Sequence, residues 1–540
     1  MLALAAALPL VVLLVGLPIL MRPAVVVAPL AWAVTVLAAI LFFNLPVGVT
    51  LLAAVQGGLV GIFPIMYIPF GALVVYNALK ATGWMDKMQG AMASITVDRR
   101  GQALLIAFGF GAFMEGICGF GAPVAIPASI LVGLGYDPMM AALVCLVANT
   151  GPVPFGSLAI PTTTLAATTG LDLMRLSQMS GRLMAPLAFL MAFATVYVMS
   201  RGKGVKGALG PILVTGLSFA LTELLVSNLV GAELTDVIAS LVCLVATSIA
   251  LSLTRSAEAP VYAAASVGAA KPGREFHPRE LFLSWLPYLV LTVLVIAVNL
   301  NATRLYFAGL KKGFEWLAVS GVIYNPGKLY RFPWLQSPGS IMLISGLIAF
   351  PFLGIPFKVL GEQLGKTARQ MIPSFVAVAS ILSISEVMNL ALPIVDPKTK
   401  LAVWGDLGVK QLSMVATLSQ AIVSSVHAHV YPLLAPVFGT IGVFLTGSNT
   451  SSNALFGNLQ KLTAQAMGLS DILMASAGNA GSPAGKMISP QSIVIAATAV
   501  GLLGKEGLIM RQTIKYTVPY LVILGAMVFG YAFLFPQWVP

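Results

Sequence analysis

The sequence predicts an all-α polytopic membrane protein that consists of two related halves. Three observations lead to this fold class. Of the 540 residues, 58% are hydrophobic and only 9% are charged, whereas a soluble globular chain carries roughly 25% charged residues. Long apolar runs recur along the whole chain, and Gly- and Pro-rich motifs of the first half return in the second.

The apolar runs are long enough to cross a bilayer as helices, because about 20 apolar residues span its hydrocarbon core. Continuous runs lie at 3–21, 24–43, 47–63, 65–80, 102–118, 183–199, 211–230, 236–253, 281–300, 339–357, 371–394, 491–504 and 516–534. Two further apolar regions, 121–160 and 432–480, are interrupted by Gly, Pro and polar residues. We therefore expect roughly 12–16 membrane-embedded segments. A β-barrel is disfavoured, since its strands alternate in hydrophobicity over short stretches.

The first apolar run and the three cysteines do not change the predicted fold class. The first run lacks a basic region before it and a second run follows Arg22, so we expect a retained helix rather than a signal peptide. Cys118, Cys145 and Cys243 lie in apolar contexts without metal-ligand spacing. Neither a metal nor a cofactor is predicted.

The net charge of +12 reflects basic connectors between helices rather than a nucleic-acid interface. The connectors at 201–207 and 255–280 are separated by two apolar runs, so they are predicted to lie on the same side of the membrane. By the positive-inside rule that side is the cytoplasm. The segment 301–337 carries basic residues on the predicted outer side, and its sidedness stays open.

An internal repeat organises the chain. The stretch "GAFMEG" (111–116) returns as "GVFLTG" (442–447), and "LGYDP" (134–138) returns as "GLSDI" (468–472). In the third pair, "ANTGPVPFGSLAIP" (148–161) matches "GNAGSPAGKMISP" (478–490). Three matches in order, about 330 residues apart, indicate a duplicated half.

The repeat predicts one transporter domain, 1–540, with two halves that we expect to be inverted. The first half covers about 1–255 with its core at 101–200, and the second covers about 281–540 with its core at 430–510. A polar cytoplasmic connector, 255–280, joins them. Gly- and Pro-interrupted helices at matching positions are typical of the central site of a secondary transporter.

Polar clusters within these interrupted regions are predicted to bind a small polar solute. A helix that breaks inside the membrane leaves free N–H donors with a partial positive charge at its new N-terminus, which suits a carboxylate. "GFGAP" (119–123), with Gly119 and Gly121, looks like one such break. The other predicted site residues are Asn149, Thr446, Ser448, Asn449, Thr450, Ser451, Ser452, Asn453, Ser489 and Gln491. Small polar residues also pack transmembrane helices together, which is the alternative interpretation.

Ionisable residues in apolar surroundings are functional candidates by default. Glu115 is the only charge between Gly101 and Tyr136, so it is the first candidate for proton coupling, with a structural brace as the alternative. Glu223 and Glu386 are secondary candidates. Lys486 and Arg182 are candidate partners of a substrate carboxylate, although either could instead extend towards the membrane interface. Glu233 and Asp236 are explained as a connector with a helix cap.

The longest motifs resemble those of the lactate permease family of bacterial 2-hydroxycarboxylate importers. The resemblance rests on "FGAFMEGICGFGAPVAIPASILVGLGYDP", "GVFLTGSNTSSNALF" and "GKMISPQSIVIAA", and it continues near 239–244 and in "VGLLGKE". It implies kinship with the ion transporter superfamily, with paired re-entrant hairpins and elevator-like movement. Glu115 matches the acidic position of the family's first motif. Asn449 stands where the second motif usually carries Asp, and the stretch around Glu386 matches poorly.

The resemblance implies proton-coupled symport of L-lactate, D-lactate or glycolate across the bacterial inner membrane by a multi-pass protein. The expected partners are a small carboxylate, a proton and the lipid bilayer, but not nucleic acid, and the oligomeric state stays open. A sodium-coupled symporter or an exchanger of another small carboxylate is the alternative, because Ser, Thr and Asn oxygens also hold Na⁺. Among the motifs of the sequence we find no catalytic set that would favour a membrane enzyme.

Overall fold

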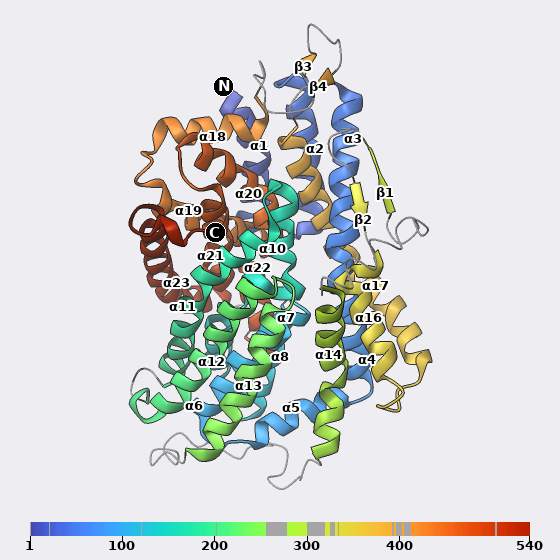
Figure 1. The fold of residues 1–540 in the computed structure, drawn as a ribbon, viewed down its shortest axis with the longest axis vertical. Helices are drawn as coiled ribbons and strands as arrows, with labels where there is room; N and C mark the ends of the chain where they lie inside the picture. Colours follow the sequence, from blue (N-terminus) through green and yellow to red (C-terminus); the bar gives the residue numbers. More distant parts are fainter. Residues whose placement is uncertain are drawn as a thin grey trace.

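The computed structural model describes most of the chain as a long bundle of helices (Figure 1). The described residues are 2–20, 22–119, 121–200, 202, 204–254, 278–299, 319–323, 330–332, 334–390, 394–395, 402–403, 412–502 and 505–540. The predicted all-α class is confirmed. The strands within these ranges form two short antiparallel pairs, β1 (Val319–Gly321) with β2 (Tyr330–Phe332) and β3 (Ile394–Val395) with β4 (Ala402–Val403).

The helices of the first half begin with an N-terminal hairpin. They are α1 (Leu2–Leu14), η1 (Val15–Ile19), α2 (Ala24–Leu41), α3 (Val47–Val60), η2 (Gly61–Met66), α4 (Tyr67–Ala81), α5 (Trp84–Ser94), α6 (Arg99–Gln102), η3 (Ala103–Phe110), α7 (Gly111–Ile117), α8 (Ala122–Gly133), α9 (Pro138–Ala148), η4 (Val153–Phe155), α10 (Gly156–Thr169), α11 (Leu173–Ser200), η5 (Lys206–Ala208), α12 (Leu209–Leu229) and α13 (Thr235–Leu253).

The second half carries the remaining helices. They are α14 (Pro278–Asn299), η7 (Trp334–Gln336), α16 (Pro338–Ala349), α17 (Phe357–Met388), α18 (Met414–Ser425), α19 (Tyr431–Thr446), α20 (Asn449–Ala466), α21 (Asp471–Ile488), α22 (Pro490–Ala499), α23 (Glu506–Phe529), η8 (Gly530–Leu534) and η9 (Pro536–Trp538).

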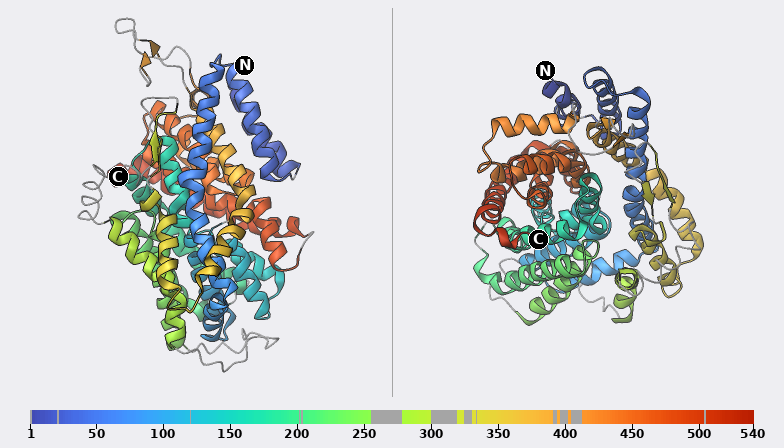
Figure 2. Two further views of the ribbon diagram at one scale, coloured as in Figure 1. Left: turned by 90° about the vertical axis from the view of Figure 1, so that its right-hand side faces the viewer. Right: turned by 45° about the horizontal axis from the view of Figure 1, so that its top comes forward.

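Seven described helices are long and apolar enough to cross a membrane, or eight if a bent pair in the first half counts as one span. Seven shorter apolar helices of 10–17 residues accompany them. The chain is thus a multi-pass membrane protein. Two runs that the sequence separates, 47–63 and 65–80, form one bent stretch of 35 residues, Val47–Ala81, along one side of the bundle (Figure 2). Its kink lies at Phe63, whose φ of −128° and ψ of 116° are not helical.

The predicted connectors are only partly described. Most of 255–280 and of 301–337 lies outside the described residues, so the sidedness of 301–337 is not addressed. Around these gaps, Lys87 pairs with Glu280 at 3.1 Å, and the Arg100 guanidinium donates to the Gly204 carbonyl at 3.0 Å. These contacts gather α5, α6 and the start of α14 at one end of the bundle (Figure 1). That this end is cytoplasmic stays a prediction.

Two buried apolar clusters hold the bundle together. The first is formed mainly by α1–α4, α14, α16 and α17, and the second mainly by α8, α9, α11, α21 and α23. Figure 1 shows α3, α4, α14, α16 and α17 on one side and α11, α12, α19, α21 and α23 on the other. The bundle therefore has two groups of helices with a boundary between them.

Glycine allows two helices within the second group, α19 and α21, to approach closely. A Cβ on Gly439 of α19 would lie 1.8 Å from the carbonyl oxygen of Gly478 in α21, and a Cβ on Gly481 would lie 2.0 Å from the carbonyl oxygen of Pro436. Such small-residue contacts drive helix association in membranes, where the hydrophobic effect between helices is lost. The α19–α21 contact therefore fixes the position of α21, which carries Lys486.

We predict that Gly439→Ala destabilises the protein, because the added methyl group meets backbone atoms that have no flexible end to move. Overpacking of this kind costs about 1–3 kcal/mol or more, so the midpoint of thermal unfolding in detergent should fall and folded yield should drop. Gly361→Ala in α17 is the control, since nothing lies within 4 Å of its Cβ position. An unchanged midpoint for Gly439→Ala would contradict the close packing.

Candidate functional site

The first broken element is the α7–α8 pair. Gly119 and Gly121 lie between the two helices with φ of +58° and +85°, a left-handed conformation that favours glycine. Gly121 is the N-cap of α8, and no side chain caps that helix. The first N–H groups of α8 therefore lie at the break, beside Gly121.

The second broken element is the α19–α20 pair. Gly447 ends α19 with φ of +69°, and Ser448 is the N-cap of α20, accepting from the Ser451 N–H at 3.4 Å. The Thr446 hydroxyl donates to the Ser448 carbonyl at 3.0 Å. The polar residues that follow Gly447 thus form a turn and the first turn of a helix, which is the break that the sequence predicts here.

Two further breaks complete the arrangement. The pair formed by α9 and the stretch Val153–Thr169 is bent by 67°, and Ser157, Leu158 and Ala159 at the start of α10 all have positive φ. In the other half, α21 ends at Ile488 and α22 begins at Pro490, with the Ser489 hydroxyl accepting from the Ser492 N–H at 3.1 Å. The two halves differ here: Asn149, Gly151 and Gly156 lie at the break between α9 and α10, whereas Asn479, Gly481 and Gly485 lie inside the continuous helix α21 (Asp471–Ile488), and the break follows them.

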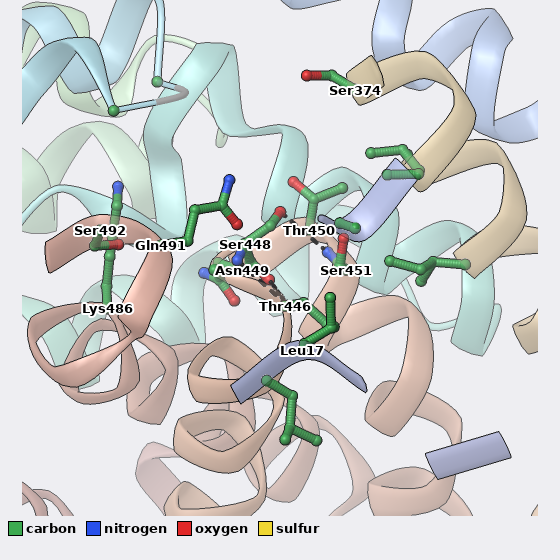
Figure 3. A pocket seen from close by; sticks show the side chains of 18 of the residues that line it. Leu17, Ser374, Thr446, Ser448, Asn449, Thr450, Ser451, Lys486, Gln491 and Ser492 are labelled. Carbon is green, nitrogen blue, oxygen red and sulfur yellow. Dashed lines mark hydrogen bonds between the residues drawn. The ribbon is translucent and has the colours of Figure 1, made fainter. Parts of the chain in front are cut away.

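A cavity of about 520 Å³ lies among these breaks (Figure 3). Its lining includes Gly121 at the start of α8, Thr450 at the start of α20 and Gln491 at the start of α22. Three helix N-termini, each with partial positive charge, therefore border one space. Such termini are natural seats for an anion.

An ion pair closes one wall of the cavity. Lys486 Nζ donates to Glu115 Oε2 at 2.6 Å, and the Asn149 amide donates to the same oxygen at 2.9 Å. The side chains of Glu115 and Lys486 are only 6% and 13% exposed. Both residues line the cavity, so the pair is mostly buried but borders the space in which a ligand would bind.

Glycine makes room for the Glu115 carboxyl. A Cβ on Gly156 would lie 2.6 Å from Glu115 Oε1, and a Cβ on Gly119 would lie 2.2 Å from the Ser157 hydroxyl. Larger residues at these positions would displace the carboxyl or the strained turn beside it. The two glycines, which also line the cavity, therefore leave the space in which the Glu115 carboxyl lies.

Asn479 of α21 connects the second broken pair to the first half. Its Oδ1 accepts from the amides of Asn449 at 2.9 Å and Asn453 at 2.8 Å, and its amide donates to Thr162 at 3.0 Å and Ser180 at 3.1 Å. All five side chains are fully or almost fully buried. This network satisfies polar groups at membrane depth, where an unpaired group is costly.

The structure brings ten of the predicted site residues to the cavity. They are Glu115, Gly119, Gly121, Thr446, Ser448, Asn449, Thr450, Ser451, Lys486 and Gln491. Four others support the lining from behind: Asn149 donates to Glu115, Asn453 donates to Asn479, Ser489 caps α22, and Ser452 donates to the Gly439 carbonyl at 3.1 Å. We therefore assign these four to positioning.

Three predicted residues lie elsewhere. The Arg182 guanidinium donates to Asn228 at 3.0 Å and to the Trp538 carbonyl. Arg182 is not part of the cavity lining, so we do not propose it as a substrate contact. Glu386 of α17 accepts from Gln56 at 3.5 Å and is not part of the cavity lining. Glu223 of α12 is fully buried, and neither of its carboxyl oxygens has a hydrogen-bond partner among the described residues.

The interpretation of Asp236 as a connector residue is wrong. Asp236 lies in the first turn of α13 and is 1% exposed, with both oxygens unpaired within the described residues. It packs against Gly116, whose Cβ position lies 2.9 Å from Asp236 Cβ. The error arose because Asp at the start of a helix is also the signature of a solvent-exposed cap.

The cavity also contains polar residues that the sequence did not single out, namely Arg22, Ser157, Ser374 and Ser492. Arg22 was noted only as a boundary between two apolar runs. A basic residue in a turn between two apolar runs is typical of an ordinary connector, so the sequence alone gives no signal for Arg22. Ser157 and Ser374 carry no signal either, because isolated serines are common in membrane helices.

We predict that Lys486→Met lowers stability strongly, because it leaves the Glu115 carboxylate buried without its cation. Removing one partner of a buried pair costs about 3–5 kcal/mol, whereas replacing both is far milder. The double variant Glu115→Gln, Lys486→Met should therefore recover most of the thermal midpoint in detergent that Lys486→Met loses. Equal losses for the single and double variants would argue against the ion pair.

The relatives of this chain among known proteins are permeases for lactate or glycolate. The model of a family described as L-lactate permease matches residues 2–535. The chain is 33% identical to an L-lactate permease of Bacillus subtilis, covering 94% of this chain and 92% of that protein. It is 34% identical to the glycolate permease GlcA of Escherichia coli, covering 99% and 96%, and 35% identical to an L-lactate permease of the same organism, covering 94% and 92%.

Similarity to solved structures is weaker. The chain matches MtrF of Neisseria gonorrhoeae with a TM-score of 0.43 at 12% identity, over 92% of this chain and 85% of that one. It matches the YdaH transporter of Alcanivorax borkumensis with a TM-score of 0.32 at 14% identity, over 79% and 84%.

Proposed function

The chain belongs to the L-lactate permease family, and from that premise we propose that it is a proton-coupled symporter for L-lactate and related 2-hydroxymonocarboxylates. D-lactate and glycolate are the related substrates, and the direction is import across the bacterial inner membrane. Its relatives are permeases, so it is a transporter and not an enzyme. The observation that carries the proposal is the Glu115–Lys486 pair at 2.6 Å, in a cavity bordered by helix N-termini.

The substrate carboxylate would replace Glu115 as the partner of Lys486. In the conformation described, the ammonium is already bound by one carboxylate. An incoming carboxylate competes for it only when Glu115 loses its charge. The N-termini of α20 and α22 add partial positive charge beside this position.

Protonation of Glu115 is the event that couples the two solutes. A neutral carboxyl binds an ammonium far more weakly than an ionised one, so the proton releases Lys486 for the substrate. Conversely, loss of the substrate leaves Lys486 without an anion, which favours loss of the proton from Glu115. The two sites bias each other through one shared cation, which is the thermodynamic requirement for coupling.

The 2-hydroxyl group would be recognised by free polar groups of the lining. Thr450 and Gln491 line the cavity, and no hydrogen bond is found for either side chain within the described residues. Figure 3 shows both side chains in the lining next to Ser448. A site with such groups discriminates against acids that lack the hydroxyl, because its donors and acceptors would then stay unpaired. The inverted repeat and elevator-like movement stay predictions.

Sodium coupling is the second candidate, because two buried side-chain oxygens could bind Na⁺. The Oδ1 atoms of Asn149 and Asn449 are buried and have no hydrogen-bond partner among the described residues. Carbonyl-type oxygens of this kind are ligands for Na⁺. The test below separates the two ions.

We predict that proteoliposomes with the wild-type protein concentrate labelled L-lactate when an inward proton gradient is imposed without sodium, and that a protonophore abolishes this. Glu115→Gln should still exchange internal for external lactate, because Lys486 stays available, but it should not concentrate lactate. Its exchange should also lose its dependence on pH. Glu362→Gln is the control, since Glu362 is about half exposed, lies outside the cavity lining and pairs with Lys366 at 3.9 Å.

Concentrative uptake by Glu115→Gln would remove Glu115 from the coupling mechanism. Uptake by the wild type only when sodium is present would favour the sodium-coupled alternative. Lack of any lactate uptake by the wild type, with glycolate uptake intact, would correct the preferred substrate.

A further inference from the structure

Arg22 is a charged residue that lines the cavity from the turn between two apolar helices. It lies between η1 and α2, at the tip of the N-terminal hairpin, with apolar helices on both sides in the sequence. Arg22 lines the cavity, and so do Leu17 before it and Ala24 and Val25 after it. Arg22 itself is exposed, so its side chain can reach a ligand that enters the cavity.

The Arg22 guanidinium is exposed and unengaged. Its backbone N–H donates to the Gly16 carbonyl at 3.0 Å, but no hydrogen bond or ion pair is found for its side chain within the described part of the chain. Two other arginines of the bundle contrast with it, since Arg175 donates to Pro540 and Arg182 donates to Asn228. Five N–H donors of Arg22 are therefore available to a ligand.

The start of α2 adds to this positive wall. Pro23 is its N-cap and supplies no side-chain cap, and α2 continues for 18 residues. Because the first-turn N–H groups of a helix have no intrahelical acceptor, those of Ala24 and Val25 are donors beside the cavity. The dipole of α2 places partial positive charge at the same end.

Arg22 gives the cavity a net positive charge that a bound monocarboxylate would balance. Its lining contains three charged residues within the described chain, Arg22, Glu115 and Lys486. Glu115 and Lys486 neutralise each other at 2.6 Å. The cation that is left for a monocarboxylate in this conformation is therefore Arg22, not Lys486.

The two cations come from different sides of the cavity. Figure 3 shows Lys486 and Ser492 at the left, Ser374 at the upper right and Leu17 below the centre. Arg22 belongs to the same hairpin as Leu17, and this hairpin packs with α17 through α2 and with α19 through η1. A carboxylate bound by Arg22 would thus lie across the boundary between the two groups of helices.

We propose that Arg22 binds the substrate carboxylate in the conformation described, from the wall opposite Lys486. The planar guanidinium forms two parallel hydrogen bonds with a carboxylate. Protonation of Glu115 then releases Lys486, which contacts the same carboxylate from the other side. This role rests on the proposed function, because it names the residue that first receives the substrate of that site.

Equilibrium binding of labelled L-lactate to the purified full-length protein tests the assignment. Arg22→Gln should raise the Kd about 10–100-fold, as expected for lost charge-assisted hydrogen bonds. Arg22→Lys keeps the charge but not the fork, so its loss should be smaller. Arg369→Gln in α17 removes the same charge at an exposed position outside the cavity, and it should bind as the wild type does.

Competition by lactamide, the uncharged amide of lactate, separates recognition from folding. The wild type should strongly prefer lactate over lactamide, and Arg22→Gln should lose most of that preference even if its overall affinity is low. If Arg22→Gln binds lactate as the wild type does and keeps the preference, the assignment of Arg22 is wrong while the proposed function stands. If the wild type binds neither lactate nor glycolate, the proposed function itself fails.

Discussion

The structure depends on keeping one carboxylate and one ammonium group together inside a protein that lipid surrounds. Glu115 and Lys486 lie 371 residues apart in the sequence, so their pairing requires that the two halves of the chain meet. The desolvation cost of such a pair is repaid only with good geometry and further hydrogen bonds. The amide of Asn149, the space beside Gly156 and the end of α21 supply that geometry.

Helix breaks around this pair reconcile two opposing requirements on the backbone. Backbone groups at membrane depth must be satisfied, yet a ligand site needs free donors. The breaks at Gly121, Ser448 and Ser489 satisfy some N–H groups with caps and leave others near the cavity. Buried amides such as Asn479 then hold the broken segments against intact helices. The ion pair of Glu115 and Lys486 therefore lies at the edge of the cavity that these breaks border.

Much of the fold and part of the site could be predicted from the sequence. The apolar runs predicted the membrane helices, and glycines with nearby Ser, Thr and Asn predicted the breaks at 119–121 and 447–448, because local chemistry determines both. The pairing of Glu115 with Lys486 could not be predicted, since it depends on how α7 and α21 pack. The same limit explains Asn453 and Ser489, which support the site from behind, and Asp236, whose position in α13 resembles an exposed cap. Arg22 could not be predicted as a site residue, because a basic residue in a turn between apolar runs resembles an ordinary connector, and its place at the cavity depends on how the N-terminal hairpin packs.

The proposed symport implies a simple cycle of charge in the cavity. With Glu115 ionised, the lining carries the single net positive charge of Arg22. A bound monocarboxylate cancels it, and a proton on Glu115 restores it, so the empty and the fully loaded cavities carry the same charge. Symport of one proton with one anion then moves no net charge, which is consistent with a carrier that need not work against the membrane potential.

The most direct test of this cycle is the proton uptake that accompanies lactate binding to purified protein in weakly buffered solution at neutral pH. The account predicts that about one proton is taken up per lactate bound, by linkage through the shared cation, and that Glu115→Gln binds lactate without taking up a proton. Lactate binding by the wild type without proton uptake would contradict the central claim that the substrate replaces Glu115 on Lys486.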